Sequence, residues 1–158
     1  MKFLVISGAP STGKTTAINK IANWLTSTLK ITLDINGNPL PTFLPDSTGK
    51  FWDFSVIIIV KGKKIIIHSA TDDQYNLDAL IEKINLHPDV EIVITSCRDL
   101  YWQRDYFINH IKPFSTFFLE SPLGKITRRN DFHIVDIWYK NTLLTLHQHI
   151  LENNPYYL

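Results

Sequence analysis

The chain has 158 residues, a length that fits one compact domain, 1–158, and leaves no room for a second domain of similar size. Sixteen basic side chains face fifteen acidic ones, so no overall charge indicates a nucleic-acid partner or an anionic membrane surface. The single cysteine excludes an internal disulfide, and no apolar run approaches the roughly 20 residues of a membrane span. We therefore expect a cytoplasmic protein without a membrane partner.

The first half of the chain predicts a strand, a helix, a long loop and a hairpin. Residues 2–7 are almost continuously apolar, as in a parallel strand buried on both faces. From 14 to 30 the apolar residues recur with the spacing of one helix face. A brief strand at 31–35 precedes a loop, 36–52, with three prolines and two glycines and no periodicity. Residues 54–70 hold two β-branched runs around a Lys-Gly-Lys turn, which predicts two antiparallel strands.

The second half alternates between helical and strand patterns. The predicted elements are a helix at 76–87, a strand at 91–95, a helix at 100–111, a strand at 115–119, a loop at 122–130 and a helix at 132–152. This alternation favours an α/β fold, a three-layer sandwich with a mostly parallel sheet and one antiparallel strand from the hairpin.

The stretch GAPSTGKTT, residues 8–16, joins the first predicted strand to the first predicted helix. Gly8 and Gly13 allow positive φ and a close approach of the backbone to a ligand. Successive N–H groups and the positive end of the following helix then form a seat for an anion. In such a seat, the Lys14 ammonium can lie against the β- and γ-phosphates and the Thr15 hydroxyl can complete a magnesium shell.

The pattern Gly8-x-x-x-x-Gly13-Lys14-Thr15 is the Walker A motif, and through it the chain resembles the P-loop NTPase superfamily over residues 3–17. The resemblance implies a P-loop fold that binds a nucleoside triphosphate with Mg²⁺. It also implies that the nucleotide is bound by Gly8, Ala9, Pro10, Ser11, Thr12, Gly13, Lys14, Thr15 and Thr16.

A magnesium site also needs a carboxylate from a neighbouring strand tip. Asp72 and Asp73 follow the second strand of the hairpin, and we expect Asp72 to be the metal ligand beside Thr15. Asp73 and, after it, Asp53 are weaker candidates. The structural alternative for Asp72 and Asp73 is an N-terminal cap of the next helix, where acidic residues are common.

Residues 96–99 are informative about which nucleotide base is bound and about phosphoryl transfer. The GTP-binding branch of the superfamily has an Asn-Lys-x-Asp motif there, whereas this chain has Ser-Cys-Arg-Asp, so we expect ATP rather than GTP. The matching acid, Asp99, is interpreted as a helix cap. Arg98, Arg128 and the adjacent Arg129 are candidates for phosphate contacts, and Lys14, Arg98 and Arg128 form the expected catalytic set. For Arg128 and Arg129 the alternative is a solvated basic loop.

The favoured function is hydrolysis, with transfer of the γ-phosphoryl group of ATP to water. One alternative is a small kinase that phosphorylates a nucleotide or metabolite. Another is a nucleotide-responsive binding module with little turnover. The sequence identifies no acceptor and no protein partner.

Overall fold

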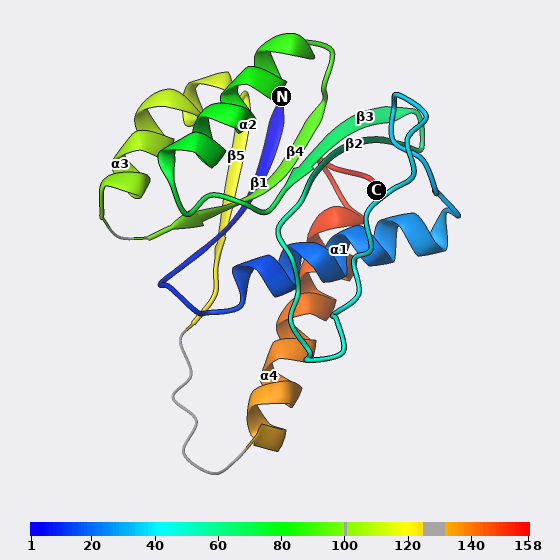
Figure 1. Cartoon of the computed structure of the whole chain (residues 1–158), viewed down its shortest axis with the longest axis vertical. Helices are drawn as coiled ribbons and strands as arrows, with labels where there is room; N and C mark the ends of the chain where they lie inside the picture. Colours follow the sequence, from blue (N-terminus) through cyan, green and yellow to red (C-terminus); the bar gives the residue numbers. More distant parts are fainter. Residues whose placement is uncertain (100, 125–131) are drawn as a thin grey trace.

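A computed structural model describes residues 1–99, 101–124 and 132–158. Within these residues the chain folds as an α/β protein around a five-stranded sheet with the strand order β2-β3-β4-β1-β5 (Figure 1). The elements are β1 (Lys2–Gly8), α1 (Lys14–Thr28), β2 (Ser55–Val60), β3 (Lys63–His68), α2 (Gln74–Leu86), β4 (Ile92–Arg98), α3 (Tyr101–His110), a 3-10 turn (Lys112–Phe114), β5 (Phe117–Pro122), α4 (Phe132–Thr145) and a π-helical turn (Leu146–Leu151).

The sheet is parallel except for the predicted hairpin. β1 pairs in parallel with β4 on one side and β5 on the other, and β3 pairs in parallel with β4. β2 pairs antiparallel with β3 through a turn in which Lys61 and Gly62 both have positive φ, 49° and 79°. Such a turn matches the twist of the two strands it joins, so the hairpin is confirmed.

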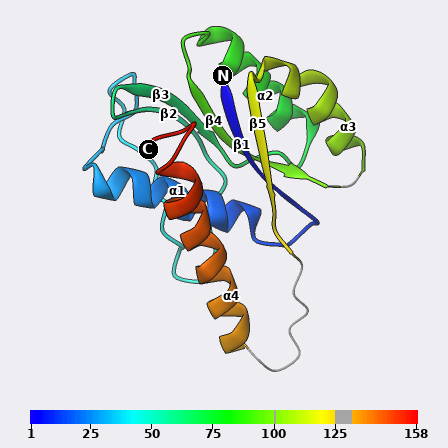
Figure 2. The same cartoon turned by 180° about the vertical axis from the view of Figure 1, so that it is seen from behind.

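Helices cover both faces of the sheet, as the two views of Figures 1 and 2 show. Leu4 and Ile6 of β1 point to the face covered by α1 and the C-terminal helix. Phe3 and Val5 point to the opposite face, which α2 and α3 cover. All four side chains are fully buried. This alternation explains the continuous apolar run and is compatible with the expected three-layer sandwich.

The strand predicted at 31–35 is not formed. Only an isolated bridge joins Leu33 to Pro39. Between them the Asp34 carboxylate accepts the backbone N–H groups of Asn36 and Asn38, at 2.8 and 2.9 Å. These local hydrogen bonds stabilise a turn, which competes with an extended strand.

The long loop that follows is confirmed as irregular up to Phe54, and an aromatic contact anchors its middle. Phe43 is buried and packs against Phe54 with ring centroids 4.7 Å apart.

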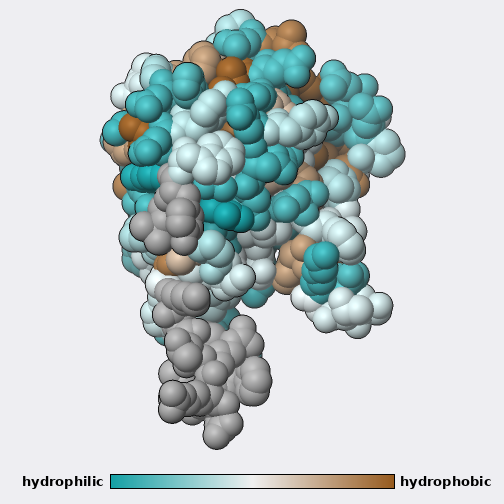
Figure 3. All heavy atoms as spheres, turned by 60° about the vertical axis from the view of Figure 1, so that its left-hand side comes forward, coloured by the Kyte–Doolittle hydropathy of each residue, from teal (hydrophilic) through white to brown (hydrophobic). Residues whose placement is uncertain are grey.

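The face in Figure 3 is mostly hydrophilic, with hydrophobic residues scattered over it. Among the described residues, no helix has both the length and the apolar character that crossing a membrane requires.

Candidate functional site

The segment between β1 and α1 is a tight loop in which three residues have positive φ. These are Gly8 (155°), Ser11 (63°) and Gly13 (90°). A Cβ atom on Gly8 would lie 2.7 Å from Thr12 Oγ1 and 2.9 Å from the carbonyl oxygen of Leu123. Glycine is therefore required at position 8 both by the backbone conformation and by the close approach of neighbouring chain.

Lys14, the first residue of α1, is buried beneath this loop. Its ammonium donates hydrogen bonds to the carbonyl oxygens of Gly8 and Ala9, both at 3.0 Å. Only 7% of the residue is exposed, and this burial lowers its pKa, an effect that the negative charge of Asp72 partly offsets. Because both hydrogen-bond partners are neutral, an anion entering beside the loop would add counter-charge to a desolvated cation.

The amino-terminal end of α1 also favours an anion beside the loop. Gly13 occupies the N-cap position, and its carbonyl oxygen accepts the N–H of Ala17 at 2.9 Å. Within the described residues no side chain caps this end, and the first turn of α1 carries no acidic side chain. The positive end of the helix dipole is therefore not neutralised by a nearby carboxylate of the same helix.

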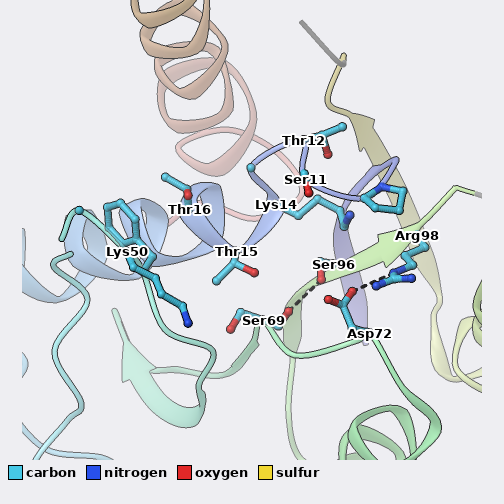
Figure 4. A pocket seen from close by; sticks show the side chains of 14 residues that line it. Ser11, Thr12, Lys14, Thr15, Thr16, Lys50, Ser69, Asp72, Ser96 and Arg98 are labelled. Carbon is cyan, nitrogen blue, oxygen red and sulfur yellow. Dashed lines mark hydrogen bonds and ion pairs between the residues drawn. The ribbon is translucent and has the colours of Figure 1, made fainter. Parts of the chain in front are cut away.

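A cavity of about 480 Å³ opens beside the loop, and Figure 4 shows the side chains around it. Two of its walls come from the carboxyl ends of β3 and β4, where the Ser96 hydroxyl donates to the Ser69 carbonyl oxygen at 3.0 Å. The chain leaves β1 toward one face of the sheet and leaves β4 toward the other, which opens a crevice between these neighbouring strands. The lining residues are Pro10, Ser11, Thr12, Gly13, Lys14, Thr15, Thr16, Gly49, Lys50, Phe51, Ser69, Asp72, Ser96 and Arg98.

Of the predicted site residues, Lys14, Thr15, Asp72 and Arg98 thus lie around one cavity. Gly8 and Ala9 do not line it but carry the carbonyl groups that hold Lys14. These positions agree with a common site.

The two acidic residues after β3 have different surroundings. Asp72 forms an ion pair with Arg98, with 2.9 Å between Oδ1 and Nε, and its side chain is 63% exposed. Asp73 is the N-cap of α2, and its Oδ1 accepts the backbone N–H of Asn76 at 2.8 Å. The capping alternative is therefore confirmed for Asp73.

A third carboxylate, that of Asp53, contacts α1 directly. The Thr15 hydroxyl donates to its Oδ1 at 3.0 Å, and the Ser69 hydroxyl donates to the same oxygen at 3.1 Å. The sequence analysis ranks Asp53 below Asp72 and Asp73 as a metal ligand. Ser69 and Ser96 were not predicted, although their places at strand ends are a usable signal. Lys50 and Phe51 come from an irregular loop that carries no such signal.

A second cavity, of about 380 Å³, adjoins the first across the same loop. Its far wall includes Asp136, Trp138 and Tyr139 of α4. The Tyr139 hydroxyl donates to the Gly13 carbonyl oxygen at 2.8 Å, and burial raises the pKa of this phenol. The C-terminal helix therefore contacts the glycine loop, a contact that the sequence pattern did not predict.

Two predictions from the sequence fall at or next to residues that the structure does not describe. Arg128 and Arg129 lie outside the residues that the structure describes, so their contact with phosphate stays a prediction. The capping role of Asp99 also stays a prediction, because the next residue is not described. Comparison with protein-family models, curated protein sequences and solved structures finds no match to this chain.

Proposed function

We propose that this protein is a P-loop nucleoside triphosphatase that binds ATP with Mg²⁺ in the 480 Å³ cavity and transfers the γ-phosphoryl group to water. The observation that carries the proposal is the buried ammonium of Lys14, held by neutral carbonyl groups at the uncapped start of α1. A desolvated cation and a helix amino terminus facing one hollow together favour a polyphosphate ligand. The volume lies within the range of small-molecule sites.

Each residue has a role in binding that follows from its chemistry. The backbone of residues 8–13 would surround the phosphates, and Lys14 would move its hydrogen bonds from the loop carbonyls to phosphate oxygens. Thr15 offers a hydroxyl oxygen to the cation. When bound, Mg²⁺ would supply charge that neutralises the β- and γ-phosphates.

In the reaction, a water oxygen forms a bond to the γ-phosphorus while the bond from that phosphorus to the bridging oxygen breaks. The bridging oxygen keeps the electron pair on ADP, and both protons of the water leave with the inorganic phosphate as dihydrogen phosphate. Arg98, whose side chain is 22% exposed in the cavity wall, supplies a fixed positive charge where negative charge accumulates. The segment Ser96 to Asp99 lacks the guanine motif, so ATP is favoured over GTP.

A small-molecule kinase is the second candidate, because the 380 Å³ cavity adjoins the loop and gives room for an acceptor as well as for a base. The two functions differ only in the group that attacks the γ-phosphorus. An acceptor in the second cavity would make hydrolysis a slow side reaction. A binding module would release little phosphate with or without an acceptor.

Phosphate release from ATP and Mg²⁺ tests the proposal, with and without a panel of nucleosides, nucleotides and metabolites. We expect steady release without an acceptor, and a loss on the order of 10²-fold in Lys14→Ala. Lys64→Ala is the control because Lys64 pairs with Asp89, away from the cavity lining. Label transfer to an acceptor would favour the kinase, and equal rates in wild type and Lys14→Ala would reject catalysis at this site.

A further inference from the structure

Three side-chain oxygens meet beside the first turn of α1, at the edge of the 480 Å³ cavity. Asp53 Oδ1 lies 3.0 Å from Thr15 Oγ1 and 3.1 Å from Ser69 Oγ. Thr15 and Ser69 both line the cavity. This group joins α1, the long loop and the end of β3, which are far apart in the sequence.

The carboxylate is held in place by the residues on either side of it. The carbonyl oxygen of Trp52 accepts the side-chain amide of Asn19 at 2.9 Å, and Asn19 is 1% exposed. The backbone N–H of Phe54 donates to the Ser69 hydroxyl at 2.9 Å. Asp53 is therefore fixed against both α1 and the β3 end, although its own side chain is exposed.

The spacing of these oxygens matches the requirements of a small divalent cation. Magnesium binds six oxygens at about 2.0–2.1 Å in an octahedron, so neighbouring ligand oxygens lie about 2.9 Å apart. The Thr15 and Asp53 oxygens, at 3.0 Å, are already close to this separation. The Thr15 hydroxyl, which donates its proton to Asp53 in the structure, would turn that proton away so that both oxygens can bind one cation.

Asp72 is placed differently. Its carboxylate is directed toward Arg98, as Figure 4 shows, and Oδ1 lies 2.9 Å from the guanidinium Nε. A cation bound by Asp72 would have to compete with this arginine and would lie close to its positive charge. The ion pair instead suits Asp72 to positioning Arg98.

The rest of a cation's ligands would come from the nucleotide and from water. Within the part of the chain that the structure describes, no three His, Cys, Asp or Glu side chains gather into a metal site. Magnesium commonly uses one or two protein carboxylates together with substrate phosphates and water. The group formed by Thr15 and Asp53 provides one carboxylate and one hydroxyl.

We propose that Asp53, rather than Asp72, supplies the carboxylate for the divalent cation that binds with the nucleotide, beside the Thr15 hydroxyl, while Ser69 orients that carboxylate. The inference rests on the proposed function, because the cation binds together with a triphosphate. It assigns metal binding to the loop that precedes the edge strand β2.

Asp53→Asn and Asp72→Asn form a matched pair, since each removes one negative charge from the surroundings of the cavity and keeps the side-chain size. The affinity for a non-hydrolysable ATP analogue is measured by calorimetry with excess Mg²⁺ and again with EDTA. We expect Mg²⁺ to tighten binding in wild type by about 10-fold or more, on the scale of losses at metal-site residues. In Asp53→Asn the ratio falls to near one, whereas Asp72→Asn keeps the ratio of wild type.

The affinity in EDTA shows whether each variant is folded, and we expect Asp53→Asn to match wild type there. Thr15→Ala gives a second measure, since alanine is well tolerated in a helix, and it too should lose the magnesium effect. A preserved ratio in Asp53→Asn with a lost ratio in Asp72→Asn would overturn this inference and leave the proposed function intact. Absence of nucleotide binding by wild type in both conditions would reject the proposed function, and this inference with it.

Discussion

Lysine side chains have different roles at the two ends of the parallel strands. We call these ends the amino edge and the carboxyl edge of the sheet. At the amino ends of the strands, Lys2 donates to the Pro155 carbonyl oxygen at 3.0 Å, and Lys63 donates to the carbonyl oxygens of Tyr156 and Tyr157. At the carboxyl ends, Lys14 donates to carbonyl groups only five and six residues before it. One set of bonds binds a distant chain segment to the sheet, and the other holds a loop beside a hollow.

The difference separates folding from binding. At the amino edge the long-range bonds accompany the burial of Tyr156, whose hydroxyl donates to the Phe3 carbonyl oxygen at 2.6 Å. At the carboxyl edge the local bonds leave an open cavity beside a desolvated charge. We therefore expect changes at the amino edge to alter only the free energy of unfolding, whereas changes to Lys14 and the glycine loop at the carboxyl edge alter nucleotide affinity.

Tyr156→Ala gives the largest expected change in stability. Removing a fully buried aromatic ring leaves a cavity and lowers the free energy of unfolding by about 3–5 kcal/mol. Tyr157→Ala, at a neighbouring residue that is 56% exposed, should change it by about 0.5 kcal/mol or less. Urea denaturation measures both. The nucleotide affinity of folded Tyr156→Ala should equal that of wild type. A large loss of affinity would show that the amino edge and the carboxyl edge are energetically coupled.

His68 is a structural group at the carboxyl edge and sharpens the comparison. Its ring is buried, donating from Nε2 to the Ala70 carbonyl oxygen and accepting from the Ser55 hydroxyl at Nδ1, while Ser55 accepts from Lys83. Burial lowers the pKa of His68 from 6.5 to about 4. Protonation therefore favours the unfolded chain, and His68 leaves stability unaffected above about pH 6.5.

As the pH falls from 6.5 to 4, His68 should cost about 3 kcal/mol of stability. Urea denaturation at a series of pH values checks this loss. In His68→Asn the same pH range should show a much shallower decline, whereas His149→Asn, at an exposed position, should decline as wild type does. A parallel decline in wild type and His68→Asn would assign the acid sensitivity to other groups.

Gly8→Ala gives a smaller loss of stability together with a loss of binding. The new Cβ would meet the Thr12 side chain and the Leu123 backbone, so we expect the free energy of unfolding to fall by about 1–3 kcal/mol and the loop to change shape. Gly62→Ala is matched to it, because Gly62 also has positive φ but a Cβ there meets nothing within 4 Å. In Gly62→Ala we expect the free energy of unfolding to fall by about 1 kcal/mol and the nucleotide affinity to stay unchanged. Equal affinities in both variants would show that the loop shape does not matter for binding.

Local patterns predicted the elements of this fold well. The strand before Gly8, the helix after Gly13 and the hairpin depend on neighbouring residues, and periodicity is enough to identify each of them. The failed strand at 31–35 depends on the Asp34 side chain, whose hydrogen bonds to the backbone outweigh a weak strand preference.

The site was predictable only in part, because some of its contacts are long-range. Their spacing within one motif identifies Lys14 and Thr15. Asp53 meets Thr15 across 38 residues, and its contact depends on how the irregular loop packs on α1. Tyr139 reaches the Gly13 carbonyl across 126 residues, which no periodicity encodes. Which carboxylate lies beside Thr15 is therefore a question of tertiary packing.

The central claim is that the loop and Lys14 bind a polyphosphate, and calorimetric titration of wild type and Lys14→Ala with a non-hydrolysable ATP analogue and Mg²⁺ tests it most directly. The account predicts saturable binding of one nucleotide per chain in wild type, and an affinity lower by about 10-fold or more in folded Lys14→Ala, as expected for the loss of a desolvated charge pair. Equal affinities in the two proteins, or no binding by wild type, would contradict it.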